Sequence, residues 1–254
     1  MKDKLLVVKI GGSIIENDLI LNDFLKSFSK IKGRKILVHG GGKIASSFLK
    51  KIGIVPKLIE GRRITDKNTL DVVIMTYAGL LNKRIVSILQ KYNCNSLGLS
   101  GSDGNLILAK KRRVEKIDYG FVGDIEKVNT NLLDEIINMK ICPIICSLSH
   151  DKEGQILNTN ADSIASKISI ELSKKFDITL KYCFDKPGLL INNTLINSIN
   201  TNDYKNLIEK NIIKDGMIPK IDSCFYALKN GVNEIFIGNH NIIKSIKNCT
   251  TLTL

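Results

Sequence analysis

The sequence predicts an α/β protein with a parallel or mixed sheet that is covered by helices on both faces. Apolar, strand-like runs alternate with helix-like segments along most of the chain, which is the pattern of such folds. The runs are almost entirely apolar, as in central strands that are buried on both sides. With 254 residues, the chain can bury a large core without disulfides or metal ions.

Six runs are predicted to form the central strands. They cover residues 5–10, 34–38, 96–99, 141–147, 178–184 and 234–237. Between the third and fourth runs, residues 105–109, 112–116 and 120–128 alternate with turns. This part of the chain therefore indicates a small antiparallel excursion from the main sheet.

The segment 71–92 is predicted to be one long helix. Its apolar residues, among them Val72, Tyr77 and Leu81, are spread over more than one face, so the helix needs burial on two sides. This pattern leaves two explanations open, an internal helix and a subunit interface. A lobe boundary is expected near Lys174-Lys175-Phe176, where an amphipathic helix ends and a strand begins.

The chain is basic, with 38 Lys and Arg against 25 Asp and Glu and a formal net charge of +13. Such a charge raises nucleic-acid or membrane binding as hypotheses. However, only six of the basic residues are arginines, and the abundant Lys, Ile and Asn share A/T-rich codons. The lysines are scattered, and the densest basic cluster, residues 110–113, is interpreted as a solvated hairpin or strand end. We therefore expect no nucleic-acid partner.

The six cysteines show no C-x-x-C pairing and mostly lie in apolar runs, so they are interpreted as buried thiols in a reducing compartment. A metal site at Cys142 and Cys146 is disfavoured because both lie in a predicted strand. The chain starts directly with a strand, without a signal peptide, and no apolar run reaches membrane-spanning length. The expectation is a cytoplasmic protein without a membrane partner.

Two glycine-rich turns follow predicted strands, Gly11-Gly12 after the first and Gly40-Gly41-Gly42 after the second. Glycine lets main-chain N–H groups approach a ligand closely, and a following helix N-terminus favours an anion. Neither turn has the G-x-x-x-x-G-K-[ST] or the G-x-G-x-x-G spacing. A P-loop and a Rossmann dinucleotide site are therefore disfavoured, and each turn is either a phosphate site of another kind or a simple strand-to-helix turn.

Three further polar stretches have the character of site loops. In residues 158–162, Asp162 falls where a helix should begin, so it is either a helix cap or a functional group. Residues 185–188 follow a predicted strand. They form either a nucleotide-binding loop at the carboxyl edge of the sheet or an ordinary turn. Lys220 opens a helix after residues 214–219 and opposes the helix dipole, which hints at a bound anion.

Seven short motifs follow one another along the chain. They are Lys9-Ile10-Gly11-Gly12-Ser13, His39-Gly40-Gly41-Gly42, Gly61-Arg62-Arg63-Ile64-Thr65, Gly101-Ser102-Asp103-Gly104, Gly123-Asp124, Asn158-Thr159-Asn160-Ala161-Asp162 and Asp215-Gly216-Met217-Ile218-Pro219-Lys220. In this order, and over nearly the whole chain, they resemble the amino acid kinase family. One such motif is a weak signal, whereas seven in order are specific.

The resemblance implies a three-layer αβα sandwich with a mainly parallel central sheet and two lobes. Residues 1–175 would form the N-terminal lobe for the acyl-amino acid and for dimerisation, and residues 176–254 the C-terminal lobe for ATP. The implied reaction, with Mg²⁺, transfers the ATP γ-phosphoryl group to the side-chain carboxylate of N-acetyl-L-glutamate in arginine biosynthesis. The helix at 71–92 matches the family's dimer helix. A homodimer with weak or no arginine inhibition is expected, since the N-terminal helix of arginine-inhibited hexamers has no counterpart before the first strand.

The resemblance also assigns roles to residues. Lys9 and Lys220 would stabilise the transferring phosphoryl group from opposite lobes, and Asp162 would hold both ammonium groups. A carboxylate nucleophile is already ionised at pH 7, so the reaction depends on positioning and charge rather than on a general base. The other assignments are phosphoryl-binding Gly11 and Gly12, substrate-binding Gly41, Gly42, Arg63 and Asn158, and nucleotide-binding Asp185, Lys186, Gly188, Leu189, Leu190, Ile212, Ile213 and Lys214.

Within the substrate site, Arg63 would bind both oxygens of the α-carboxylate, and Asn158 the acylamino group. The register favours Arg63 over its neighbour Arg62. Mg²⁺ would be held largely by phosphates and water, because the sequence contains no carboxylate cage. The alternatives are an N-succinylglutamate kinase, another member of the family, or a silent arginine- or nucleotide-sensing module. A succinyl group would need an extra cation that the sequence does not locate.

Overall fold

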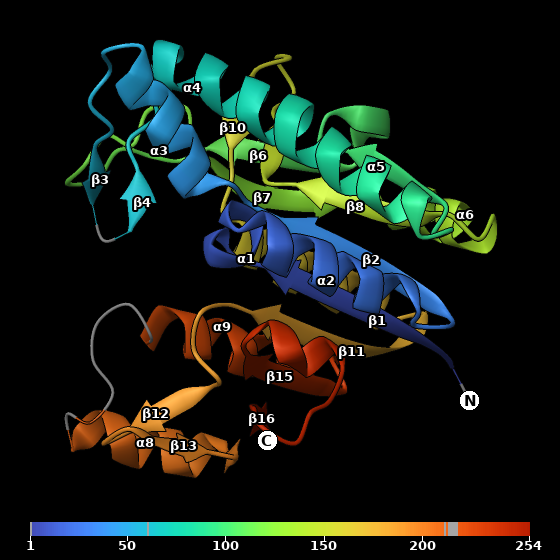
Figure 1. Ribbon diagram of the computed structural model, residues 1–254. Helices are drawn as coiled ribbons and strands as arrows, with labels where there is room; N and C mark the ends of the chain where they lie inside the picture. The colour runs from blue at the N-terminus through green and yellow to red at the C-terminus, as the bar shows by residue number, and fades with distance from the viewer. Residues whose placement is uncertain (1, 60, 211, 213–217) are drawn as a thin grey trace.

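A computed structural model of the protein describes residues 2–59, 61–210, 212 and 218–254, and it confirms the α/β prediction (Figure 1). Eight strands form the central sheet in the order β14-β16-β15-β11-β1-β2-β8-β5. Neighbouring strands are parallel, except that β15 and β16 are antiparallel. Their bounds are β1 (Asp3–Ile10), β2 (Arg34–His39), β5 (Ser96–Leu99), β8 (Cys142–Cys146), β11 (Phe176–Cys183), β14 (Ser198–Ile199), β15 (Glu234–Gly238) and β16 (Thr250–Leu252).

The central sheet is buried on both faces because its strands alternate apolar side chains between two cores. In β1, Leu5 and Val7 belong to one core, whereas Val8 and Ile10 belong to the other. The first core is covered by α6 (Thr130–Asn138), α7 (Ala161–Leu172), α8 (Thr201–Glu209) and α9 (Ile218–Lys229). The second is covered by α1 (Gly12–Glu16), α2 (Asp18–Ser29), α3 (Gly42–Lys51) and a long helix described below, and Figure 1 shows α1 and α2 in front of the sheet. The predicted three-layer sandwich is therefore present.

The central sheet continues across the expected lobe boundary. β11 begins at Phe176 and pairs with β1 along its whole length, from Asp3 opposite Phe176 to Ile10 opposite Cys183. The two parts of the chain therefore share one sheet. The division into lobes 1–175 and 176–254 stays a prediction.

A second sheet, in the order β10-β9-β6-β7, extends the predicted antiparallel excursion. Two of its predicted strands are present, but the third, residues 112–116, has no strand structure. β9 is missing from the prediction because it follows β8 after a single residue, so one apolar run spans two sheets. The bounds here are β6 (Ile107–Lys111), β7 (Gly123–Val128), β9 (Leu148–His150) and β10 (Ile156–Asn158). Short hairpins are formed by β3 (Leu58–Ile59) with β4 (Arg62–Arg63) and by β12 (Leu189–Ile191) with β13 (Thr194–Ile196).

The predicted helix 71–92 is part of a longer one. Its successive parts are α4 (Lys67–Ile74), the π-helical η1 (Met75–Leu81) and α5 (Asn82–Lys91). The prediction misses the first turn, whose signal is the N-cap: the Asp66 carboxylate accepts a hydrogen bond from the Thr69 N–H at 2.8 Å. Tyr77 and Leu81 pack into the second core. The long helix is therefore anchored to the layer that carries the glycine turns.

The same helix corrects one expectation. Its 25 residues reach a hydropathy of 1.5 over an 18-residue window, so by length and composition it is apolar enough to cross a membrane. A helix in a protein core meets the same criterion, and 44% of this window is buried inside the protein. On the opposite side, Met75 and Leu80 are 62% and 47% exposed. The helix is thus a core element that keeps one apolar face uncovered.

His39 ends β2 and ties the second glycine turn to the long helix. Its buried ring has Nε2 3.1 Å from the Asn82 Nδ2 and Nδ1 2.9 Å from the Gly40 oxygen. Because the Asn82 amide nitrogen can only donate, the imidazole is neutral with its proton on Nδ1. Asn82 also donates to the Ile144 carbonyl in β8 at 2.9 Å. Burial lowers the pKa of His39 from 6.5 to about 4.

We expect the stability of the protein to fall between pH 6.5 and pH 4 more steeply than that of the variant His39→Gln. In this range the unfolded chain takes up a proton at His39 that the folded protein excludes, so stability rises with pH. The full contribution of this proton uptake to the free energy of unfolding is about 3 kcal/mol. Urea unfolding of both proteins at pH 7 and pH 4.5 measures it, and an equal loss in the two proteins would contradict this role.

Candidate active site

The two glycine turns stand at the carboxyl ends of neighbouring central strands, as predicted. β1 ends at Ile10 and Gly11 precedes α1, while β2 ends at His39 and Gly41 precedes α3. Because β1 and β2 are parallel, the N-termini of both helices lie at the same edge of the sheet. A cavity of about 560 Å³ opens there and is lined by both turns.

Eight of the predicted site residues meet in this cavity, whereas Lys220 is not among its lining residues. Its lining includes Lys9, Gly11, Gly12, Gly41, Gly42, Arg63, Asn158 and Asp162. They come from β1, from the two glycine turns, from β4, from β10 and from the first turn of α7. Residues far apart in the sequence therefore share one concave site.

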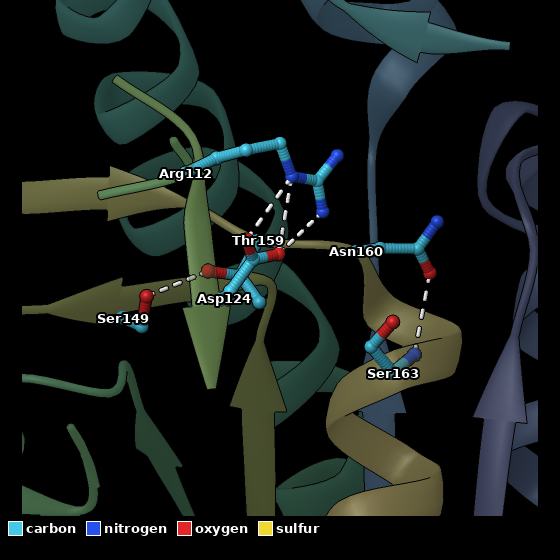
Figure 2. Close-up of polar contacts among 6 residues, drawn as sticks. All are labelled: Arg112, Asp124, Ser149, Thr159, Asn160 and Ser163. Carbon is cyan, nitrogen blue, oxygen red and sulfur yellow. Dashed lines mark hydrogen bonds and ion pairs between the residues drawn. The ribbon is translucent and has the colours of Figure 1, made fainter. Parts of the chain in front are cut away.

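The N-terminus of α7 decides between the two interpretations of Asp162. Asn160 is the helix cap, because its side-chain oxygen accepts hydrogen bonds from the N–H groups of Asp162 at 2.7 Å and Ser163 at 3.3 Å. Figure 2 shows Asn160 in this role above Ser163. The Asp162 carboxylate is therefore not used as the cap.

Asp162 instead joins two lysines. Lys9 Nζ lies 2.8 Å from Asp162 Oδ1, and Lys220 Nζ lies 3.8 Å from Asp162 Oδ2. Lys220 Nζ is also 4.4 Å from the centre of the Phe184 ring, a cation–π distance. The end of β1 and the first turn of α9 thus bring two ammonium groups to one carboxylate, which leaves one positive charge in excess.

Asp162 stays ionised between the lysines. Burial raises the pKa of its carboxyl group, but the charges of Lys9 and Lys220 outweigh burial and bring the pKa below its ordinary value of 3.8. A permanently charged Asp162 can therefore hold both ammonium groups at any pH near neutrality.

Arg63 is a buried cation that forms no ion pair with a carboxylate of the described residues. Its Nη2 donates to the Gly42 carbonyl and to the Ser46 hydroxyl, both at 2.7 Å. Its Nη1 is buried and has no hydrogen-bond partner in the described part of the chain. Leaving a buried guanidinium nitrogen unpaired is costly, so Nη1 is the atom available to an anionic ligand. Arg62 also lines the cavity but is exposed.

Asn158 presents an acceptor to the cavity. Its Nδ2 donates to the Thr65 hydroxyl at 3.0 Å, and Thr65 in turn donates to the Arg63 carbonyl at 3.1 Å. With Nδ2 engaged, the carbonyl oxygen of the Asn158 side chain is left for an N–H donor. The next residue, Thr159, shares a 2.6 Å hydrogen bond with Ser149 of β9, which Figure 2 shows. This bond anchors the loop to the second sheet.

Two residues of the cavity wall had no role in the sequence prediction. Arg112 follows β6, and its Nε lies 3.1 Å from Oδ1 of Asp124 in β7 (Figure 2). The basic run 110–113 was expected to be solvated, yet the Arg112 side chain is only 22% exposed and lines the cavity. The antiparallel register of β6 and β7, which pairs Lys111 with Gly123 and Lys110 with Asp124, brings Arg112 to this position and is seen only in the structure.

The predicted nucleotide-binding residues lie apart from this cavity. Asp185, Lys186, Gly188, Leu189 and Leu190 follow β11 and are not among its lining residues. Gly188 instead packs closely on a neighbouring strand, where a Cβ would lie 2.9 Å from the Thr250 nitrogen. Ile212 is 43% exposed. Ile213 and Lys214 lie outside the described residues, so their assignment stays a prediction.

The sequence profile described as the amino acid kinase family matches residues 4–239. The chain belongs to the amino acid kinase family. An acetylglutamate kinase from Bacteroides fragilis is 46% identical over 241 residues, which cover 93% of this chain and 92% of that protein. An acetylglutamate kinase from Azobacteroides pseudotrichonymphae is 42% identical over 257 residues, which cover 99% and 100% of the two chains.

Solved structures share the amino acid kinase fold with this chain. A Streptococcus mutans protein superposes with a TM-score of 0.81 at 26% identity, over 98% of both chains. Carbamate kinase from Giardia lamblia superposes with a TM-score of 0.70 at 13% identity, also over 98% of both. At 13% identity the likeness concerns the fold alone.

We expect Gly41→Ala to destabilise this amino acid kinase by roughly 1–3 kcal/mol and to lower its activity. A Cβ at Gly41 would overlap the Leu81 side chain and lie 2.9 Å from Tyr77 Cδ1, so the turn and the long helix would have to separate. Gly40→Ala is the matched control, because a Cβ there lies 3.7 Å from Ala161 Cβ, an ordinary contact. Thermal unfolding compares the variants, and equal melting temperatures would contradict the close approach.

Proposed function

We propose that this chain is an acetylglutamate kinase, which transfers the γ-phosphoryl group of ATP to the side-chain carboxylate of N-acetyl-L-glutamate in arginine biosynthesis. The product is N-acetylglutamyl 5-phosphate. The two relatives with this name described above match over 93% and 99% of the chain. The structural observation that carries the proposal is the pair of lysines that share Asp162 beside two glycine turns.

The reaction needs charge and position rather than proton transfer. The substrate carboxylate is ionised at neutral pH. One of its oxygens bonds to the γ-phosphorus, the bond from this phosphorus to the bridging oxygen breaks, and ADP leaves with that electron pair. Lys9 and Lys220 would stabilise the charge on the transferring group, together with the N–H groups of Gly11 and Gly12. Asp162 would position the two lysines.

The acceptor half of the site fits an acylated amino acid. Arg63 Nη1 would bind the α-carboxylate, because it is the guanidinium nitrogen without a partner among the described residues. Asn158 would accept the N–H of the acylamino group through its carbonyl oxygen. Gly41 and Gly42 would donate main-chain N–H groups to the acceptor carboxylate. The cationic Arg63 disfavours the positively charged amino group of a free amino acid nearby.

ATP is proposed to bind mainly to residues 176–254, and the acyl-amino acid to residues 1–175. The nucleotide contacts would come from Asp185, Lys186, Gly188, Leu189, Leu190 and Ile212, and from Ile213 and Lys214 beyond the described residues. Mg²⁺ would supply charge neutralisation of the phosphates and would be held by phosphates and water. The donor set of the cavity fits this, since its carboxylates Asp124 and Asp162 are each engaged by a cationic side chain.

A cytoplasmic enzyme without nucleic-acid or membrane partners is part of the proposal. All six cysteines are free and buried, which suits a reducing compartment. Lys9, Arg63 and Arg112 line a cavity of small-molecule size, whereas nucleic-acid binding needs an extended basic surface.

ATP turnover with N-acetylglutamate, N-succinylglutamate, glutamate and aspartate, measured side by side, tests the proposed function. ADP release is expected with acylated glutamate and not with the free amino acids. Absence of ADP release with both acyl-glutamates would overturn the proposal.

In the same assay, Lys220→Ala is expected to lower kcat by about 100-fold or more with little change in KM. The lysine would act mainly on charge that develops in the transition state. Lys229→Ala is the matched control, because Lys229 is exposed in the last turn of the same helix. An effect of Lys220→Ala on KM alone would contradict the assigned role.

We also propose that the protein is a homodimer through the helix at 71–92. Met75 and Leu80 of this helix are exposed, and Leu97, on the edge strand β5 of the central sheet, is 41% exposed. Exposed apolar residues that gather on one helix and its neighbouring edge strand favour an interface over solvent.

The dimer is expected to sediment at twice the chain mass of 28.2 kDa, and Leu80→Lys is expected to shift it to monomer at micromolar concentration. A lysine at this position would bury an unpaired charge in the interface. Leu19→Lys, at an 83% exposed position of α2, serves as the control and should leave the mass unchanged. A wild-type monomer would contradict the proposed interface.

A further inference from the structure

Arg112 is a second guanidinium in the cavity, and the proposed reaction gives it no task. Its side chain leaves the end of β6 and reaches over Asp124 of β7, as Figure 2 shows. Its main-chain N–H donates to the Val122 carbonyl at 2.8 Å, so its backbone is also held by the second sheet. Arg112, Val122 and Asp124 all line the same cavity as Arg63 and Asn158.

The Arg112 guanidinium is held in one orientation. Nε and Nη2 both donate to the Asp124 carboxylate, and the Nε–Oδ1 distance is 3.1 Å. The Tyr119 ring covers the guanidinium at 5.5 Å from its centroid. An arginine that is fixed by a bidentate carboxylate and an aromatic face is pre-organised for recognition, because little entropy remains to be lost on binding.

One nitrogen of this fixed group has no partner. Arg112 Nη1 is buried and donates no hydrogen bond to any acceptor among the residues that the structure describes. Its N–H groups are therefore desolvated without compensation, which is costly for a charged donor. Arg63 Nη1 is in the same condition. The cavity thus offers two separate donor sites for anionic groups on one ligand.

The charge of the cavity favours a carboxylate over a neutral group at Arg112. In the described part of the chain, six cationic side chains and two carboxylates line the cavity. Lys43 and Lys167 are paired with Glu16 and Glu171 outside the lining, so the excess positive charge comes from Arg62 and Arg63. Both carboxylates, Asp124 and Asp162, are already engaged by cations. A carboxylate also accepts a stronger hydrogen bond from a guanidinium than a carbonyl does.

We propose that Arg112 selects the acyl group of the substrate and that the site takes N-acylglutamates whose acyl chain ends in a carboxylate, such as N-succinylglutamate, as a further substrate. The inference rests on the proposed function. The α-carboxylate occupies Arg63, the acylamino group faces Asn158, and the terminal carboxylate meets Arg112 Nη1. Val122 and Ile125, which also line the cavity, supply apolar contact for the methylene groups of the chain.

The test compares kcat/KM for N-acetylglutamate and N-succinylglutamate in the wild type and in Arg112→Met. This variant keeps the length and apolar stem of the side chain and removes the donor. The wild type is expected to use N-succinylglutamate at least as well as N-acetylglutamate. Arg112→Met should lower kcat/KM for N-succinylglutamate by roughly 10- to 100-fold and leave N-acetylglutamate within about threefold.

Two further variants keep the test decisive. Arg113→Met is the matched control, because Arg113 is the exposed neighbour and lies outside the cavity lining, and it should change neither substrate. Arg112→Lys keeps the charge without the planar fork and should retain part of the preference for N-succinylglutamate. If Arg112→Met does not fold, the wild-type comparison and Arg112→Lys still decide.

Distinct results overturn the two proposals. Turnover of N-acetylglutamate without turnover of N-succinylglutamate overturns the role of Arg112 and leaves the proposed function standing. An equal loss of both substrates in Arg112→Met, at unchanged melting temperature, also overturns it, because Arg112 would then contact a group that both substrates share. If neither N-acetylglutamate nor N-succinylglutamate is turned over, the proposed function itself is overturned.

Discussion

The arrangement of the site depends on one carboxylate between two ammonium groups. Asp162 contacts Lys9 and Lys220, which come from the end of β1 and from the first turn of α9. Without this shared counter-ion the two cations would repel each other. Asp162 is free for the task because Asn160 caps α7 in its place. Because Asn160 caps the helix, the Asp162 carboxylate is left to pair with the two lysines.

The central sheet brings the other parts to that centre. β1 and β2 are parallel neighbours, so the glycine turns that follow them meet at one edge. The Tyr77 and Leu81 side chains of the long helix lie against Gly41 so closely that a Cβ would not fit. His39 and Asn82 tie the same turn to α5 and β8. The turn is therefore held by packing and by hydrogen bonds at the same time.

The second sheet gives the cavity its other wall. β10 ends at Asn158, and the β6–β7 pair places Arg112 beside Asp124. Arg63 and Arg112 each keep one buried guanidinium nitrogen without a partner among the described residues. In the proposed function, the central sheet would supply the phosphoryl-transfer centre, and the second sheet would supply the residue that contacts the acyl end of the substrate. Under these proposals, catalysis and acyl selectivity would depend on two different sheets of one fold.

The alternation of strands and helices and the two glycine turns could be predicted from the sequence, because apolar periodicity and turn chemistry are local properties. Roles for Lys9, Asp162 and Lys220 came from the resemblance to the family, and they stay predictions. The folded structure was needed to show that Asn160 is the cap, that β8 and β9 belong to different sheets, and that the long apolar helix is partly buried in the core. The structure also shows that Arg112, which was expected in a solvated run, lines the cavity. These outcomes depend on partners that lie far away in the chain, and a linear pattern carries no record of which side chain a residue will face.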